Sequence, residues 1–475
     1  MEMQMQMPLC GRLITVRGGS ELVVWSSRIY KGIEEDSTMN TQEPTDNNGA
    51  YTSVSPEDHD EALANYMQAT LYNDSPLSSK CCIFRIPDVF RRHNEKVYEP
   101  DVIAIGPFHH RKPSLQPMEI VKKWYLRTLL SRLNISMLGL VKGIKEFEKR
   151  ARDCYQEPID LDQNEFIEML IIDGCFLVEL FRKETISELR SMDDPIFNMA
   201  CMHQFLYHDL LLLENQLPWF VLQYLFNLTM ENDQRTLSLT ELVLKFFQAC
   251  FPLTNHSKSS PRLDLENLHI VDLIRNVLIS SFPGVQSGPK PEKPKLIPCV
   301  TELIKAGVKF TKSSSDNMMD IVFTNGTFEI PPFSIEETTE PIFRNLIAFE
   351  QCYHSCEDKI TSYAILMDNL INTSKDVEIL SDKGIIDNWL SAEDASQYFN
   401  RLYNDTFVTT FFYSELCKDV NEYYRAKWPK WRAILFRDYL TNPWTIISLV
   451  AAFVLLVLTF LQTFYSIKQF YSSGD

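Results

Sequence analysis

Residues 165–181 read EFIEMLIIDGCFLVELF, and residues 209–226 read DLLLLENQLPWFVLQYLF. Both stretches are apolar on almost every face, which predicts helices at the centre of a core. Each stretch also carries an acid inside its apolar run, Asp173 in the first and Glu214 in the second. These stretches therefore predict a mainly helical protein and supply its first candidate polar residues.

The segments on either side predict a small amount of β-structure. Upstream, CCIFRIP (81–87) and DVIAIGPF (101–108) have strand character. Downstream, IVFTNGTFEIPPF (321–333) places Asn325-Gly326 between two alternating apolar runs, which favours a two-residue hairpin turn. We therefore expect a mainly α protein with a small antiparallel β-sheet (α+β), built from the two upstream strands and the hairpin.

Composition divides the chain into four parts. Residues 1–78 are acidic and polar, and we expect them to be mostly disordered apart from a short helix. Residues 79–440 form the α-rich body, in which a stretch rich in Pro, Gly and Lys at 282–295 predicts an exposed linker. An uncharged stretch at 443–467 and a short tail at 468–475 follow.

The uncharged stretch is long enough to cross a membrane. Its core is WTIISLVAAFVLLVLTFLQTFYSI (444–467), and a helix rising about 1.5 Å per residue spans a hydrocarbon layer of about 30 Å over this length. Asn442 predicts the N-cap and Pro443 suits the first helical position. Trp444 and Tyr465 suit the two membrane interfaces. We expect a single-pass anchor in a lipid bilayer, with the plasma membrane as the candidate membrane.

Charges near this stretch predict the orientation of the body. Four basic residues precede it and Lys468 follows it closely, so the positive-inside rule places the body in the cytosol. The N-terminus lacks the pattern of a secretory signal peptide, which suits a tail-anchored chain. Seven N-x-S/T sequons leave the opposite orientation open. The basic residues are Lys427, Lys430, Arg432 and Arg437, and the sequons begin at Asn73, Asn134, Asn227, Asn255, Asn325, Asn372 and Asn404.

Overall composition argues against some classes of partner. The net charge of −17 is unsuited to nucleic acid, because phosphate binding draws on clustered Lys and Arg. The 11 cysteines are scattered, which indicates buried or free thiols in a reducing compartment. No phosphate-binding loop, nucleophile elbow or H-E-x-x-H helix is present in the sequence, so we predict no catalytic, cofactor-binding or metal-binding residue and no cofactor.

Two weaker groups contain histidine. Cys352 and Cys356 flank His354 with a spacing that puts two thiols one helical turn apart, but no second pair completes a four-ligand zinc site. His109-His110, with His93 upstream, could supply a general base or a metal ligand. Adjacent residues on an extended loop point in opposite directions, so we expect one of the two to pack against the body.

The third group is the pair of acids in the apolar helices. A buried carboxylate needs partners, or its pKa rises until it is neutral. If Asp173 and Glu214 faced each other, they could perform acid–base chemistry as in hydrolases. The alternative is that each caps backbone groups or pairs with an arginine, such as Arg85 or Arg91. Asp173, Glu214, Arg85 and His109 are thus the buried polar candidates.

The order of these motifs resembles a known family. The block CCIFRIPDVFRRHNEKVYEPDVIAIGPFHH (81–110) resembles the leading motif of the plant domain-of-unknown-function 247 family, also called UPF0481. The likeness covers roughly residues 80–467 and continues through LIIDGCFLVELF, HDLLLLENQLPWFVL, LIPCVTELIKAGVKF, the hairpin, NLIAFEQC and NPWT. The resemblance implies one C-terminal transmembrane helix and no established catalytic activity. Some grass members are implicated in pollen–stigma self-incompatibility as recognition components.

Two functions follow as hypotheses. The first is a membrane-anchored interaction, recognition or signalling protein with an unidentified protein partner, contacted through the acidic N-terminus, the loop at 182–195 or the linker at 282–295. The second is a membrane-tethered hydrolase that uses the buried carboxylates or a histidine. The hydrolase hypothesis requires these side chains to converge in one open pocket.

Overall fold

A computed structural model describes residues 56–71, 77–230, 237–251, 267–280, 296–315, 317–426 and 443–472. The linker predicted at 282–295, the basic residues before the C-terminal helix, Asn442 and most of the N-terminal extension lie outside these ranges. The chain divides into two compact units at Leu71. In the first unit, α1 (Pro56–Thr70) is the described helix.

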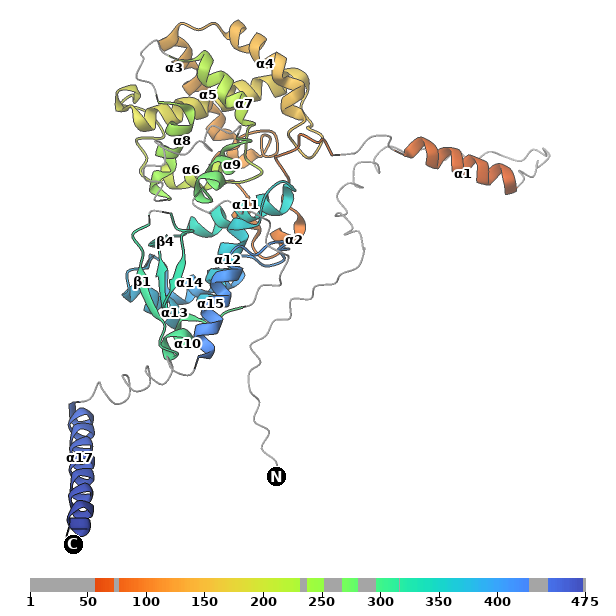
Figure 1. Cartoon of the computed structure of the whole chain (residues 1–475). Helices are drawn as coiled ribbons and strands as arrows, with labels where there is room; N and C mark the ends of the chain where they lie inside the picture. Colours follow the sequence, from red (N-terminus) through yellow and green to blue (C-terminus); the bar gives the residue numbers. More distant parts are fainter. Residues whose placement is uncertain are drawn as a thin grey trace, which may run out of the picture. The chain divides into compact units, whose positions relative to one another are not determined.

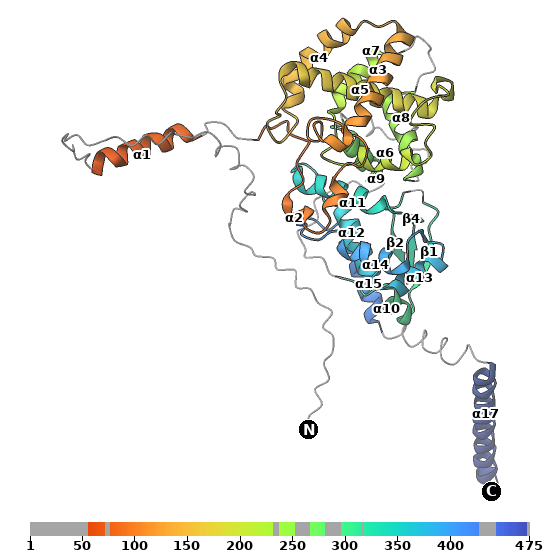
Figure 2. The same cartoon turned by 180° about the vertical axis from the view of Figure 1, so that it is seen from behind.

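The second unit is mainly helical, as the sequence predicts. Its first group of helices surrounds α5, and its second group carries the strands; Figures 1 and 2 show the two groups from opposite sides. The first group comprises α3 (Gln116–Leu133), α4 (Met137–Arg152), α5 (Gln163–Thr185), α6 (Met202–Leu210), α7 (Trp219–Leu228), α8 (Leu239–Phe246) and α9 (Ile270–Leu278). The second comprises α10 (Val300–Lys305), α11 (Thr339–Cys352), α12 (Lys359–Leu370), α13 (Ser374–Asp382), α14 (Ala392–Arg401) and α15 (Ser414–Arg425). Short helices are α2 (Asp88–Arg91), η2 (Glu95–Tyr98), η3 (Pro113–Leu115), η4 (Ser187–Leu189) and η5 (Phe247–Ala249).

Helix α5 is the centre of the first group. It begins with a capping box in which Asp162 accepts from the N–H of Glu165 and Glu165 reaches back to the N–H of Asp162. Nearly all of its side chains from Phe166 onward are buried, and it packs against α3, α4, α7 and α8. At Gly174 an added Cβ would lie 2.3 Å from Leu225 Cδ1 of α7, so the two helices approach closely. The prediction that this stretch is a central helix is confirmed.

The second apolar stretch is not one helix, contrary to the prediction. Helix α6 ends at Leu210, and α7 begins at Trp219 after Pro218. Proline cannot donate a backbone hydrogen bond within a helix, and the side chains of Asn215 and Gln216 bond to nearby carbonyls that a continuous helix would use. The result is a buried, irregular segment between the two helices.

The strands form two small sheets. In the first, β3 (Thr327–Ile330) lies between β1 (Lys309–Lys312), its parallel neighbour, and β2 (Val322–Thr324), its antiparallel neighbour. In the second, β4 (Phe333–Ile335) pairs in parallel with β5 (Ile386–Asn388). The predicted hairpin is confirmed: Asn325 and Gly326 have φ of 50° and 79° and join β2 to β3. At Gly326 an added Cβ would also meet the Tyr423 ring at 2.3 Å.

The two predicted upstream strands do not join either sheet. Within CCIFRIP the structure has one isolated bridge, between Ile83 and Tyr155, and 101–108 forms no strand. The prediction of a sheet built from these segments was wrong. Alternating apolar residues occur in any extended chain with one buried face. Beyond the bridge, the N–H groups of Arg85, Ile86 and several residues of 101–106 bond to side chains in place of a neighbouring strand.

The C-terminal helix α17 covers Pro443–Ser472. Within it, Ile446–Lys468 is long and apolar enough to cross a membrane by length and composition, and none of its described side chains is buried against other parts of the protein. Pro443 is the first helical residue, and both Trp444 and Tyr465 are exposed.

Candidate functional site

The leading segment, which comprises residues 81–111, is irregular apart from the short helices α2 and η2. Seven of its backbone N–H groups bond to side chains that are distant in sequence. The acceptors are Gln156 for Arg85, Glu214 for Ile86, Asp209 for residues 101–103, Asn215 for Ile105 and Asp173 for Gly106. Because a buried N–H without a partner is energetically costly, these side chains determine the path of the segment.

Glu214 differs from the other acids of this group in contacting two arginines. Its carboxylate is buried, and Oε1 accepts from the N–H of Ile86 and from Arg91, both at 2.6 Å. Oε2 accepts from Arg85 at 3.0 Å and lies 3.3 Å from Nε2 of His109. Glu214 therefore contacts both arginines that the sequence suggested, and His109 is the buried member of the histidine pair.

The surroundings keep Glu214 ionised. Burial alone would raise its pKa, but the contact with His109, the charges of Arg91 and Arg85 and the N–H of Ile86 lower the pKa to about 2. A carboxyl group with so low a pKa holds no proton near neutral pH, so it cannot serve as a general acid there. Its role in this arrangement is to accept hydrogen bonds from several parts of the leading segment.

The two arginines extend this network toward the surface. Arg85 stacks on Phe108, with 4.2 Å between its guanidinium carbon and the ring centroid, and donates to Glu157. Arg91 donates to Glu99, which also accepts from Lys112 at 2.7 Å. The planar guanidinium groups thus connect the buried carboxylate of Glu214 to the more exposed charged side chains of Glu157, Glu99 and Lys112.

Asp173 holds the same segment from α5. Its Oδ2 accepts from the N–H of Gly106 at 2.9 Å, and its Oδ1 lies 2.5 Å from Nζ of Lys122. Lys122 also donates to the carbonyl of Ala104 and contacts Glu119. Burial opposes the charge on Lys122, but the two carboxylates raise its pKa above the usual value. Asp173 and Glu214 therefore each have a cationic partner of their own.

Lys122 was not identified from the sequence, although a signal exists. It lies four residues after Met118 and three before Tyr125, and all three side chains are buried on α3. A lysine in a buried helical stripe requires an acid opposite it, because an unpaired buried charge is strongly unfavourable. The position of Asp173 inside the apolar run of α5 supplies that acid.

The clasp segment, residues 208–216, holds the leading segment from the other side. Asn215 accepts from Ile105 and donates to the carbonyl of Ile103, while Gln216 accepts from the N–H of Ile270 in α9. Leu213 donates to Asn345 of α11. The clasp therefore links the leading segment to both groups of helices. Sequence reasoning missed Asn215 and Gln216, although both interrupt an apolar run.

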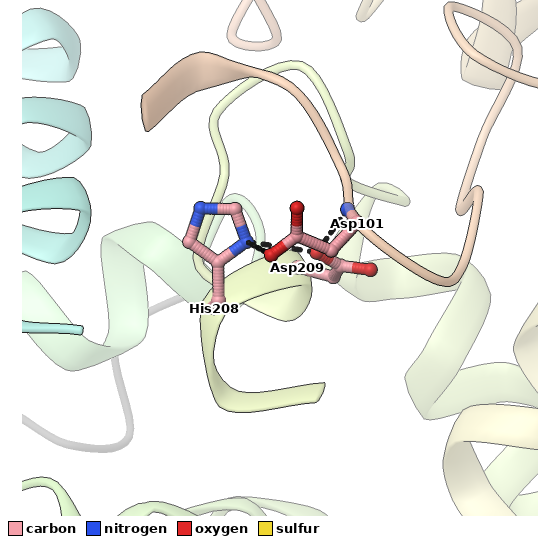
Figure 3. A group of neighbouring side chains, drawn as sticks. All are labelled: Asp101, His208 and Asp209. Atoms are coloured by element: carbon pink, nitrogen blue, oxygen red, sulfur yellow. Dashed lines mark hydrogen bonds and ion pairs between the residues drawn. The ribbon is translucent and has the colours of Figure 1, made fainter. Parts of the chain in front are cut away.

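Asp101, His208 and Asp209 form a group whose ligand atoms lie within 4.8 Å of one another (Figure 3). Asp209 Oδ1 accepts from the N–H of Asp101 and from Nδ1 of His208, each at 2.8 Å. Its Oδ2 accepts from Val102 and Ile103, also at 2.8 Å. Four donors thus occupy both oxygens, so the contacts explain Asp209 as an anchor for backbone N–H groups. A metal ion would have to displace these bonds.

Among the described residues, the remaining histidine and cysteine candidates do not gather into a group of three or more possible metal ligands. Helix α11 ends at Cys352, so Cys352 and Cys356 do not share a helix face. Burial raises the pKa of both thiols to about 12, which disfavours the thiolate that a metal needs. His354 contacts Ser355, and His93 contacts Asp405.

The arrangement defines an α-rich protein whose leading segment is held by a buried polar network, ahead of a long apolar helix. Over residues 83–458 the sequence matches the family described as "plant protein of unknown function", DUF247. The chain belongs to this plant family, and the match extends into α17.

Two relatives come from Arabidopsis thaliana. A UPF0481 protein is 29% identical over 450 residues, covering 86% of this chain and 92% of the relative. A putative UPF0481 protein is 25% identical over 477 residues, covering 80% of this chain and 89% of the relative. No solved structure matches the chain.

Proposed function

We propose that this chain is a single-pass membrane protein whose body binds a protein partner. The observation that carries the proposal is α17, in which the span Ile446–Lys468 is apolar and exposed along its described length. Exposed apolar surface of this extent is unfavourable in water and favourable in a bilayer.

The few polar groups of α17 support this placement. The hydroxyls of Ser448, Thr459 and Thr463 donate to the carbonyls four residues earlier, at 2.8–2.9 Å. In hydrocarbon every polar group needs a partner within the protein, and these bonds supply one. The basic residues before the helix favour a cytosolic body.

Two features support binding over catalysis. Asp173 and Glu214, on which the hydrolase alternative rests, accept hydrogen bonds from the leading segment and are each paired with cations. Helix α1 carries exposed apolar side chains at Leu63, Tyr66 and Met67, spaced along one helical face, after an acidic first turn. An amphipathic acidic helix suits a groove that is apolar with a basic rim.

The anchor is tested by extraction of membranes with alkaline carbonate. We expect the full chain to stay in the membrane pellet and a variant with Leu455→Arg and Leu456→Arg to be released, because arginine at the centre of a span is unfavourable by roughly 2.5–3.5 kcal/mol. Phe407→Arg, at an exposed apolar residue of the body, is the matched control and should stay in the pellet. Release of the unaltered chain would refute the anchor.

Partner binding is tested by proximity labelling in plant cells with the full chain. We expect a reproducible set of labelled proteins, part of which disappears when Leu63, Tyr66 and Met67 are replaced by serine. The matched control replaces Phe407, an exposed apolar residue of the body outside the proposed contact segments, by serine and should leave the labelled set unchanged. A set no different from that of an unrelated protein carrying the same anchor would refute the proposal.

A further inference from the structure

The leading segment and the end of α4 lie side by side at a short parallel bridge. Ile83 pairs with Tyr155, and the N–H groups of Cys82 and Ile83 both donate to the carbonyl of Cys154 at 2.9 Å. Gln156 returns a bond to the carbonyl of Ile83 at 3.0 Å. One position before the bridge, this register places Cys82 opposite Cys154. Paired strands lie about 4.8 Å apart, which falls within the Cα separation of roughly 4.4–6.8 Å that a disulfide requires.

The two thiol groups also lie close enough to interact. Both residues are buried, with 3% of Cys82 and 6% of Cys154 exposed, and the Cys154 thiol donates to the carbonyl of Arg150 at 3.4 Å. The interaction with Cys82 lowers the pKa of Cys154; burial opposes this effect, and the nearby charge of Arg150 adds to it. The interaction with Cys154 and burial raise the pKa of Cys82. Cys154 is therefore the more acidic of the two thiols.

We infer that Cys82 and Cys154 form a redox-active thiol pair that closes to a disulfide when a small peroxide reaches it. In the first step the thiolate of Cys154 attacks one oxygen of hydrogen peroxide, the O–O bond breaks, and the released hydroxide takes a proton to become water. Cys154 is then a sulfenic acid. In the second step the sulfur of Cys82 attacks the sulfur of Cys154, the S–O bond breaks, and the hydroxyl leaves with the proton of Cys82 as a second water. Two thiols are oxidised and one peroxide is reduced.

Neighbouring thiols differ from this pair in ways that supply controls. Cys81 is adjacent in sequence, but successive side chains of an extended segment point to opposite sides, and burial raises the pKa of its thiol to about 12. Cys175 is buried in α5, and its pKa is likewise about 12. Cys201 is exposed, so it reports simple accessibility to the oxidant.

The position of the pair gives the disulfide a structural effect. Arg85 and Ile86, which both bond to Glu214, follow Cys82 by three and four residues. A bond from Cys82 to Cys154 would fix the start of the leading segment covalently to the turn that follows α4. The oxidation state of the pair would then set how readily this segment separates from the clasp.

The experiment treats the full chain in detergent with hydrogen peroxide, blocks free thiols by alkylation and maps the peptides by mass spectrometry. We expect a cross-linked peptide pair containing Cys82 and Cys154, lighter by two hydrogen atoms and separated again by dithiothreitol. Cys81→Ser should leave this cross-link in place. Cys82→Ser should leave Cys154 as a sulfenic acid that dimedone labels, whereas Cys154→Ser should leave Cys82 unlabelled.

The mapping of the unaltered chain decides the inference even if a variant fails to fold. Recovery of Cys82 and Cys154 as alkylated thiols, under conditions that oxidise Cys201, would overturn it. A cross-link from Cys82 to any other cysteine would also overturn it. The unfolding midpoint in urea should rise on oxidation of the unaltered chain and stay unchanged in Cys82→Ser.

Discussion

Replacing Glu214 by glutamine tests whether the charge of this buried acid holds the leading segment. Glutamine keeps the size of the side chain and one acceptor oxygen, but it removes the negative charge that faces Arg85, Arg91 and His109. The folded pKa of about 2 lies below the ordinary value of about 4.3 for glutamate. At about 1.4 kcal/mol per pKa unit, this difference corresponds to roughly 3 kcal/mol of stability near pH 7. This value agrees with the cost of breaking a buried ion pair, which is typically about 3–5 kcal/mol.

The pH dependence has a definite sign. Because the folded pKa of Glu214 is depressed, its contribution is complete above the unfolded pKa and is lost as the pH falls from about 5 toward 2. The difference in free energy of unfolding between the unaltered chain and Glu214→Gln should therefore shrink over this range. Urea denaturation of the full chain in detergent, followed by tryptophan fluorescence, measures the difference without screening charges as guanidinium would.

Glu157→Gln is the matched control, since Glu157 also accepts from Arg85, at 3.2 Å, but is half exposed. An exposed pair of this kind contributes about 0–1 kcal/mol. The reasoning would be refuted if Glu214→Gln lost less than about 1 kcal/mol at pH 7. It would also be refuted if the loss were the same at pH 3 as at pH 7.

Three further measurements test other parts of the structure. Asp173→Asn should lower the free energy of unfolding, measured in urea, by about 3–5 kcal/mol, because the buried charge of Lys122 loses the carboxylate that faces it. Asp160→Asn, at a fully exposed carboxylate, should have almost no effect. Equal effects would contradict the role of Asp173 as the partner of Lys122. Gly384→Ala should lower the free energy of unfolding by about 1–2 kcal/mol, because alanine is strained at its positive φ. Gly326→Ala should lose this amount and a further ~1–3 kcal/mol, because the added Cβ collides with Tyr423. Equal losses in the two variants would argue against close packing at Gly326. Chain purified from plant cells should keep its mass on treatment with an endoglycosidase, because sequons in a cytosolic body are not glycosylated; a loss of mass would place the body on the opposite side of the membrane.

The parts of the fold that the sequence predicts depend on local patterns. Helix α5 follows from an apolar run, and the β2–β3 hairpin follows from Asn325-Gly326. The side chain of Ser391 caps α14 by accepting from the N–H of Asp394, three residues later. In each case the residues that determine the element are neighbours along the chain.

The parts that could not be predicted depend on partners far apart in sequence. Residues 81–87 look like a strand, but Ile86 bonds to Glu214, 128 residues later. Strands β4 and β5 are three residues long and pair in parallel, which leaves no periodic signal to detect. Of the site, sequence patterns indicated Glu214 and its arginines, because an acid in an apolar run needs a cation. The roles of Asp209 and Asn215 become visible only once the leading segment is placed.

The bonding of the leading segment to the clasp has a consequence for folding during synthesis. Arg85 leaves the ribosome 129 residues before Glu214, a delay of roughly 6–26 s at about 5–20 residues per second. The carbonyl of Val97 accepts from the side chain of Asn345, which lies 248 residues later in the chain. During this interval the leading segment lacks part of its final packing, so the nascent chain is exposed to aggregation and to chaperones. Helices α3, α4 and α5 can form earlier from local contacts, and the first part of the body to be synthesised is therefore among the last to reach its final position.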